Sequence, residues 1–365
     1  MYATFGWYTG GSTIRKVLPM NIHLPHTATG RGVCLLLTAV LLSLCLAGLA
    51  SCSDQVYDPT QGTLILNEGT GKLPNHGNGN LELPTEPPTG SVIEIPNADP
   101  FADSPHVLRA DFLNTGNSDT ILIRMDETVI LVDTGEADDY PAISRKLTEY
   151  GITTIDYLII SHYDNDHIGT MSQILQHYTV KNLYMPDYVR DSSLYRRMMS
   201  MLDVTDGVTV HRPTEDVRID LPYGSLWINP TKIYEPGVTL GSDDAHSLEE
   251  NNYSLITSVY FGDISLLLAG DAEQDRITEF MEIEDIKLTY DVIKIPHHGG
   301  YDKALGNLLR ENSGLRYCMV HAGSKGLVEA SLVTAMRTSG AAAKFTYDGD
   351  IAFATDGTSM TVNQN

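Results

Sequence analysis

The segment Leu158–Gly169 reads LIISHYDNDHIG and carries four side chains that can bind a metal ion. They are His162, Asp164, Asp166 and His167. Imidazole and carboxylate groups bind zinc, manganese or iron, and a site without thiolates is not typical of a structural zinc finger. The alternative is that this segment is a solvated acidic turn with two histidines that bind nothing. The metal-binding interpretation therefore needs support from other parts of the sequence.

Apolar runs that read as buried strands precede this motif and three other candidate positions. Leu158–Ile160 leads into the motif, TVILVD ends in Asp133, and LLLAGD ends in Asp271. The run DVIKIP is followed by His297 and His298, two adjacent histidines for which packing offers little reason. Open α/β sheets bind ligands outside the ends of their strands, so these side chains are expected to converge on one site.

The pattern from about His106 onward alternates strands and helices, which predicts one α/β domain over residues 106–365. Strands are expected in VLRADFL, TILIRM and TVILVD, and the C-terminal AKFTYDGDIAFATDGTSMTV is typical of a β-meander with Asp-Gly turns. The other expected strands are Lys181–Met185, Ser225–Ile228, Ser254–Phe261 and Ile264–Ala269. The expected helices are Tyr140–Tyr150, Ile168–His177, Glu273–Met281, Lys303–Glu311 and Leu327–Ser339.

The N-terminal segment differs from the rest of the chain. Arg15, Lys16 and Arg31 precede an uncharged apolar run, Val33–Ala50, which is typical of an export signal. The run leads into Leu-Ala-Ser-Cys, which resembles the lipobox of bacterial lipoproteins and implies a lipid on Cys52. The alternative is an uncleaved membrane anchor, because the run is just long enough to span a bilayer.

We therefore expect residues 1–51 to be a lipoprotein signal peptide and residues 52–105 a flexible tether rich in Pro, Gly, Asn and Thr. The domain would then be exported and lipid-anchored, on a periplasmic or cell-surface face. Cys318 is the one cysteine beyond Cys52, so no disulfide framework is expected. The formal net charge of −23 over 365 residues disfavours tight nucleic-acid binding through phosphate contacts.

The order of motifs resembles the metallo-β-lactamase superfamily: a strand followed by Asp133-Thr134-Gly135, then H-x-D-x-D-H, Gly-Asp and Pro-His-His-Gly. ADFLNTGNSDTILIR, LIISHYDNDHIGT, NNYSLI, LLLAGDAE and VIKIPHHGG are, in this order, most similar to the hydrolase domain of ComEC/Rec2-type competence proteins. The likeness covers about residues 106–360. It implies an αββα four-layer sandwich with one or two divalent ions at one edge of two sheets; zinc is expected, and manganese is the alternative.

The resemblance also implies a role for each candidate. One metal would take His162 and Asp164, and the other would take Asp166 and His167. Asp271 would bridge the two, and His297 or His298 would complete the set. Asp133 would orient the ligands rather than bind the metal.

Two departures from the superfamily pattern bear on these roles. Most members have a histidine where this chain has Asp164, and a third histidine for the first metal is missing. Glu250-Asn251-Asn252 stands in its place, with His246 slightly upstream. The first metal is therefore expected to be weakly held or bound through oxygen ligands. His321 matches a histidine-containing loop only loosely, and is either a proton donor to the leaving group or an ordinary strand-end residue.

The predicted function is a membrane-tethered hydrolase that uses a metal-activated water on a phosphodiester or similar small ester. Asp166 is expected to orient that water or take its proton. Two alternatives remain open: a carboxylic ester, lactone or amide hydrolase, and a non-catalytic binding lipoprotein with a vestigial metal site.

Overall fold

The computed structural model describes residues 55–58, 63–66, 99–241, 248–283 and 286–364. The chain divides into two compact units, residues 1–79 and 80–365. In the first unit β1 (Gln55–Asp58) and β2 (Thr63–Leu66) pair antiparallel. The candidate site residues all belong to the second unit. No helix in the described part of the chain has the length and apolar character needed to cross a membrane.

One sheet of the second unit has eight strands in the spatial order β19-β18-β3-β4-β5-β6-β7-β9. The strands from β19 to β5 pair antiparallel, and those from β5 to β9 pair parallel. In chain order they are β3 (Leu108–Phe112), β4 (Ile121–Met125), β5 (Thr128–Val132), β6 (Thr154–Ile159), β7 (Thr179–Tyr184), β9 (Thr209–His211), β18 (Ile351–Thr355) and β19 (Met360–Gln364).

The second sheet has seven strands in the order β10-β11-β13-β14-β15-β16-β17. Pairing is antiparallel from β10 to β14 and parallel from β14 to β17. The strands are β10 (Val217–Leu221), β11 (Gly224–Asn229), β13 (Ile256–Phe261), β14 (Ile264–Leu268), β15 (Val292–Lys294), β16 (Tyr317–Val320) and β17 (Ala342–Phe345). A separate parallel pair consists of β8 (Tyr188–Asp191) and β12 (Val238–Gly241).

Successive side chains of a strand point to opposite faces, and both faces of these sheets are covered. In β4, Ile121 and Ile123 belong to the core between the two sheets, whereas Leu122 belongs to the core under the helices of the first layer. This is why the strands read as nearly continuous apolar runs rather than as alternating ones.

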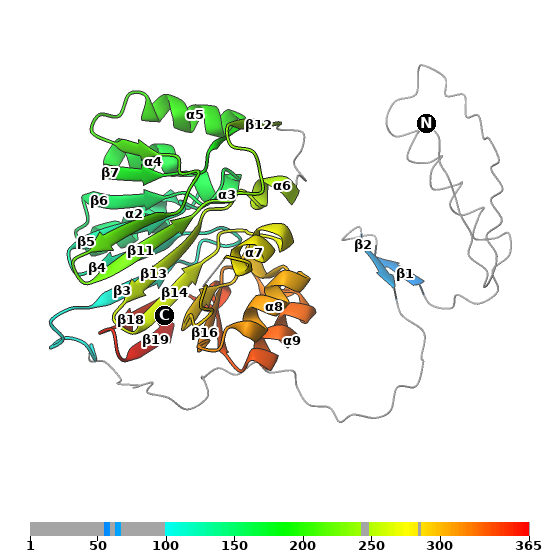
Figure 1. Ribbon diagram of the computed structural model, residues 1–365. Coiled ribbons are helices and arrows are strands. Elements are labelled where there is room, and N and C mark those ends of the chain that lie inside the picture. The colour runs from blue at the N-terminus through cyan, green and yellow to red at the C-terminus, as the bar shows by residue number, and fades with distance from the viewer. Residues whose placement is uncertain (1–54, 59–62, 67–98, 242–247, 284–285, 365) are drawn as a thin grey trace, which may run out of the picture. The chain divides into compact units, whose positions relative to one another are not determined.

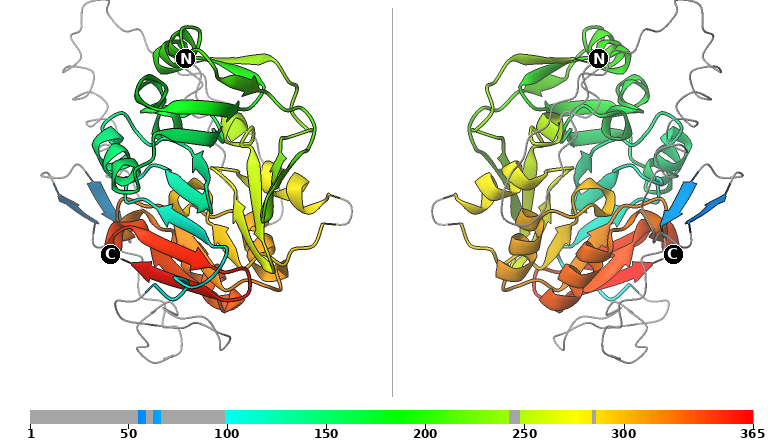
Figure 2. Two further views of the ribbon diagram at one scale, coloured as in Figure 1. Left: turned by 90° about the vertical axis from the view of Figure 1, so that its left-hand side faces the viewer. Right: turned by 90° about the vertical axis from the view of Figure 1, so that its right-hand side faces the viewer.

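Helices cover the outer face of each sheet (Figures 1 and 2). Those on the eight-stranded sheet are α2 (Tyr140–Glu149), α3 (Asn165–Ile168), α4 (Met171–His177) and α5 (Ser193–Leu202). Those on the seven-stranded sheet are α7 (Gln274–Met281), α8 (Lys303–Glu311) and α9 (Ala330–Ser339). The short α6 (Leu248–Asn251) precedes β13. The order of layers is therefore helix, sheet, sheet, helix, and the predicted αββα sandwich is confirmed.

Two expectations about the fold need correction. The C-terminal segment is not one meander, because β17 extends the seven-stranded sheet while β18 and β19 form a hairpin in the other sheet. The helix expected over Ile168–His177 is divided into α3 and α4. The strands β1 and β2 lie within the segment expected to be a flexible tether, and its flexibility stays a prediction. The proposed signal peptide and Cys52 lie outside the described residues.

The ends of β6 and β14 meet across the sandwich, and this contact places the candidate site residues together. The backbone N–H of Leu255 donates to the carbonyl oxygen of Ser161 at 2.9 Å, which joins the chain after β6 to the start of β13. At Gly270, after β14, φ is +54°, and a Cβ atom there would lie 2.6 Å from the Cβ of Ser161. This close approach requires glycine.

Candidate metal centre

The motif after β6 folds into an extended segment and one helical turn. Ser161, His162 and Tyr163 continue from the end of β6, and α3 then begins at Asn165. Asp164 is the N-cap residue of α3, but its side chain does not cap the helix. The turn of α3 brings His167 back toward the sandwich, where the histidine is completely buried. The short helix is therefore what turns a linear motif into converging side chains.

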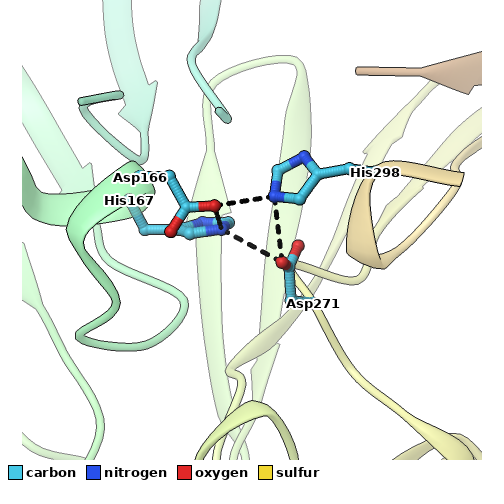
Figure 3. Close-up of side chains that lie close together, drawn as sticks. All are labelled: Asp166, His167, Asp271 and His298. Carbon is cyan, nitrogen blue, oxygen red and sulfur yellow. Dashed lines mark hydrogen bonds and ion pairs between the residues drawn. The ribbon is translucent and has the colours of Figure 1, made fainter. Parts of the chain in front are cut away.

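Asp166, His167, Asp271 and His298 form one compact group, with one candidate ligand atom from each within 4.8 Å of all the others. His298 Nε2 lies 2.8 Å from Asp166 Oδ2 and 3.1 Å from Asp271 Oδ2. His167 Nε2 lies 3.3 Å from the same Asp271 oxygen and 3.7 Å from Asp166 Oδ2. Figure 3 shows the four side chains pointing toward one common point, from α3, from the end of β14 and from the loop after β15.

This donor set fits a divalent cation. Two imidazole nitrogens and two carboxylate oxygens are ligands that zinc and manganese accept, and two carboxylates balance the charge of a dication. His167 Nε2 is fully buried and forms no hydrogen bond with the described residues, although a buried polar atom normally has a partner. A cation held between these four side chains would give that nitrogen its partner.

The carboxylates control the protonation of both histidines in the metal-free chain. Burial alone lowers the pKa of His298, but the Asp271 and Asp166 carboxylates outweigh it and raise this pKa to about 10. Burial likewise opposes the charge on His167, yet its neighbouring carboxylates, Asp271 first, raise the pKa well above 6.5. The reciprocal effect holds the pKa of Asp271 well below its usual value despite burial. A metal ion must therefore compete with protons for this site.

The two adjacent histidines after β15 diverge because the backbone turns sharply there. His297, His298 and Gly299 all have positive φ, of 51°, 50° and 95°. His297 points outward, with 47% of its side chain exposed, and its Nδ1 lies 3.0 Å from Glu273 Oε1. His298 points inward and is 6% exposed. Only His298 of this pair belongs to the four-residue group. Left-handed backbone at two non-glycine residues is strained, and such strain clusters at functional sites.

Asp133 supports His167 from behind. Its Oδ2 lies 2.9 Å from His167 Nδ1 and also accepts a hydrogen bond from Ser161 Oγ, while Oδ1 accepts from the Ser161 backbone N–H at 2.7 Å. With Nδ1 engaged by a carboxylate, the Nε2 atom of His167 is the one that faces the other three side chains. Asp133 thus lies where the resemblance expects a residue that orients a ligand.

His162 and Asp164 lie beside the four-residue group without joining it. His162 is fully buried, its Nδ1 lies 3.1 Å from Ser161 Oγ, and its Nε2 lies 3.6 Å from Asp164 Oδ2. Asp164 Oδ1 lies 2.9 Å from Arg190 Nη1. Within the described residues, His162 and Asp164 belong to no group of three or more ligands. His246 lies outside the described residues.

Sequence reasoning missed two buried charged residues behind the site. Lys294 on β15 forms an ion pair with Asp119. Its Nζ also donates a hydrogen bond to the Gly270 carbonyl oxygen at 2.9 Å, and it lies 3.4 Å from Asp271 Oδ1. Asp119 Oδ1 in turn lies 3.7 Å from His298 Nδ1. A lysine inside the apolar run DVIKIP was the available signal, because a buried ammonium requires a carboxylate partner.

His321, the predicted proton donor, is completely buried after β16. Its Nδ1 lies 3.3 Å from Asp119 Oδ1, and burial lowers the pKa of its imidazole to about 4, although the Asp119 carboxylate opposes that shift. Within the described residues, His321 belongs to no group of three or more candidate ligands. Its proposed part in proton transfer stays a prediction.

Comparisons with known proteins found similarities to one curated protein and to several solved structures. ComE operon protein 3 of Bacillus subtilis (strain 168) is 31% identical over 155 residues, which cover 42% of this chain. The match spans only 18% of that relative's length. Among solved structures, the metallo-beta-lactamase fold protein YhfI from Bacillus subtilis is 14% identical with a TM-score of 0.42, covering 66% of this chain and 96% of its own. CmlA, a diiron beta-hydroxylase from Streptomyces venezuelae, is 16% identical with a TM-score of 0.39, covering 65% and 52%.

The model of one protein family matches residues 113–312, more than half of the chain. This range contains the motif after β6, the end of β14 and the loop after β15, and so all four members of the compact group. The chain belongs to the metallo-beta-lactamase superfamily.

Proposed function

We propose that this chain is a metal-dependent hydrolase of small phosphodiesters or similar esters. The observation that carries the proposal is the convergence of Asp166, His167, Asp271 and His298 at the meeting point of the two sheets. These four residues would hold the cation. When bound, it would supply Lewis-acid activation of a water molecule and of the substrate's oxygen.

The surrounding residues have separate tasks in this proposal. Asp133 fixes the ring of His167, and Lys294 and Asp119 hold Asp271 and His298 from behind. Asp166 has 23% of its side chain exposed, compared with 7% for His298 and 3% for Asp271. It is therefore the member of the group that reaches solvent, and we assign it the role of accepting a proton from the attacking water.

The choice of substrate rests on two features. The ComEC-like order of motifs favours a phosphodiester, while the net charge of −23 disfavours long polyanions and favours a small substrate. A carboxylic ester, lactone or amide is the alternative. Zinc suits the nitrogen donors and manganese the carboxylates, so we propose zinc with manganese as the alternative.

We also propose that the chain is exported and anchored to a membrane by a lipid on Cys52. The basic segment, the apolar run and the small residues before Cys52 support this. Expression of the full chain and of Cys52→Ala in a bacterium fed a radioactive fatty acid tests it. The label should enter the wild-type chain and be absent from the variant; label in both would reject the assignment.

The function is tested by metal content and turnover on the same samples. The purified chain and Asp271→Asn are loaded with zinc or manganese, dialysed, analysed by mass spectrometry for metal, and assayed with bis-p-nitrophenyl phosphate. Asp206→Asn, an exposed residue in the turn after α5, is the matched control. Metal and diester cleavage should both be present in the wild type and control and lost in Asp271→Asn.

Other outcomes decide between the alternatives. Bound metal without diester cleavage, together with turnover of a p-nitrophenyl carboxylic ester, would move the assignment to the ester class. A folded wild-type chain that takes up neither metal would overturn the hydrolase proposal and favour a binding lipoprotein.

A further inference from the structure

Arg190 lies where its charge bears directly on the second candidate metal pair. It belongs to β8, outside the two large sheets, and its side chain is 13% exposed. Its Nη1 lies 2.9 Å from Asp164 Oδ1 and also forms an ion pair with Glu250 Oε2. A single guanidinium thus engages both carboxylates next to His162.

Both carboxylate oxygens of Glu250 have a partner in this arrangement. It is 2% exposed, and while one of its oxygens pairs with Arg190, the other accepts a hydrogen bond from the Tyr188 hydroxyl at 2.8 Å. That hydroxyl also accepts from the backbone N–H of Tyr163 at 2.8 Å, within the motif itself. Because each oxygen of Glu250 already has a partner and Arg190 balances its charge, this carboxylate is less available to a cation than a carboxylate without partners.

His162 and Asp164 form the remaining candidate pair. Their nearest atoms are 3.6 Å apart, which two ligands of one ion can tolerate, whereas zinc usually has three or four protein ligands. No third donor joins them within the described residues. A dication at this pair would also face the guanidinium on the other oxygen of Asp164, and the two positive charges would repel each other. His162 Nε2, like His167 Nε2, forms no hydrogen bond within the described residues, so it is the charge of Arg190 that makes this corner a poor site for a second metal.

We propose that the chain binds one metal ion, at Asp166, His167, Asp271 and His298, and that the guanidinium of Arg190 takes the place of a second cation by neutralising Asp164 and Glu250. This inference rests on the proposed function only in that it needs the four-residue group to bind metal. Arg190 is in this view a positioning residue that fixes the number of metal ions.

The test is metal stoichiometry in the full chain. Wild type, Arg190→Ala and Arg196→Ala are titrated with manganese, freed of excess ion and analysed for metal per chain. Arg196 is the matched control, since its side chain is 62% exposed on α5 and its loss changes the net charge equally. We expect about one ion per chain in the wild type and the control, and about two in Arg190→Ala, since removal of the guanidinium frees Asp164 and Glu250 to act as ligands beside His162.

Electron paramagnetic resonance gives a second readout on the same samples. The wild type should show isolated manganese, and Arg190→Ala the spectrum of a spin-coupled pair. Two ions in the wild type would overturn the inference while leaving the hydrolase proposal intact. One ion in a folded Arg190→Ala would also overturn it. No ion in any sample would instead reject the proposed function.

Asp164→Asn covers the case in which Arg190→Ala does not fold. If Asp164 pairs with Arg190 rather than with a metal, this variant should keep the one ion of the wild type. A fall in stoichiometry in the folded variant would show that Asp164 is a ligand, and the inference would be wrong.

Discussion

Asp133 and His167 form a buried pair in which the carboxylate Oδ2 lies 2.9 Å from the imidazole Nδ1. Asp133 directly follows β5, and His167 lies on α3, which comes after the neighbouring parallel strand β6. Asp133 itself has a φ of 56°, a conformation that few non-glycine residues adopt. The sheet thus holds a strained aspartate in place to orient one histidine.

Replacing Asp133 tests this positioning role. Asp133→Ala removes the partner of Nδ1 and should weaken metal affinity by about 10–100-fold, the usual effect of losing such a support. Asp133→Asn keeps an acceptor oxygen and should lose less. Competition with a chromophoric chelator measures both. Equal affinities in wild type and Asp133→Ala would show that the ring of His167 is fixed by packing alone.

The buried pair Lys294–Asp119 should matter for stability as well as for the site. Lys294→Met leaves Asp119 buried without its ammonium partner and should lower the free energy of unfolding by about 3–5 kcal/mol. Urea denaturation of the metal-free protein measures the change. The double variant Lys294→Met/Asp119→Asn should lose clearly less than the two single changes added together, because it removes both charges.

Lys181 provides the matched control for that experiment. It also pairs with an aspartate, Asp156, but its side chain is 58% exposed. Lys181→Met should leave unfolding almost unchanged, since exposed ion pairs contribute little. An equal loss in both lysine variants would contradict the role given to burial.

Metal binding should release protons. The pKa of His298 is raised to about 10, so its imidazole is positively charged at pH 7 in the metal-free chain, and the neighbouring carboxylates shift the pKa of His167 in the same direction. A cation at the two Nε2 atoms must therefore displace protons, including the one on His298. Calorimetric titration at pH 7 in buffers of different ionisation enthalpy measures the number of protons released. Binding without proton release would contradict the assignment of both histidines.

The same shifts set the direction of the pH dependence. Apparent metal affinity should fall as the pH falls, because protons compete for the histidines, and should level off only above the His298 pKa of about 10. The folding stability of the metal-free protein depends on pH in the opposite direction, because the folded state raises the pKa of His298. The stabilisation from protonated His298 is complete below about pH 6.5 and is lost as the pH rises toward 10.

Gly299 should be required for the inward position of His298. Its φ is +95°, and a Cβ atom there would lie 3.2 Å from the Cα and Cγ2 atoms of Val328. Gly299→Ala should therefore lower stability by about 1–3 kcal/mol and weaken metal binding. Gly207→Ala is the control, since Gly207 has a φ of +81° but open space around its Cβ position. Thermal unfolding should shift in both, while metal affinity should change in Gly299→Ala alone.

Much of the site could be predicted because its members follow apolar strands in the sequence. Asp271 and the cluster that begins at His162 were found in this way, and the structure brings Asp166, His167, Asp271 and His298 together. The choice between His297 and His298 could not be predicted, because it depends on three consecutive left-handed residues. Arg190, Asp119 and Lys294 were missed because their partners lie far away in the sequence. A pattern within one segment does not show such contacts.

The fold shows the same division between local and long-range information. Most strands and helices were predicted within a few residues because their apolar runs are long and clearly bounded. The C-terminal strands were assigned to one meander, whereas β17 pairs with β16 in one sheet and β18 with β3 in the other. Turn chemistry predicts where a chain reverses, but the choice between two packed sheets is made by side chains that meet only after folding.

The four candidate ligands come in two pairs, one from each half of the sandwich, and this arrangement has a consequence for the stability of the protein. His298 and Asp166 are 132 positions apart in the chain, yet they contact each other. An ion bound there would act as a reversible cross-link between the halves, and it would close a very long loop. Resistance to unfolding and to proteolysis would then follow the supply of free metal around the protein.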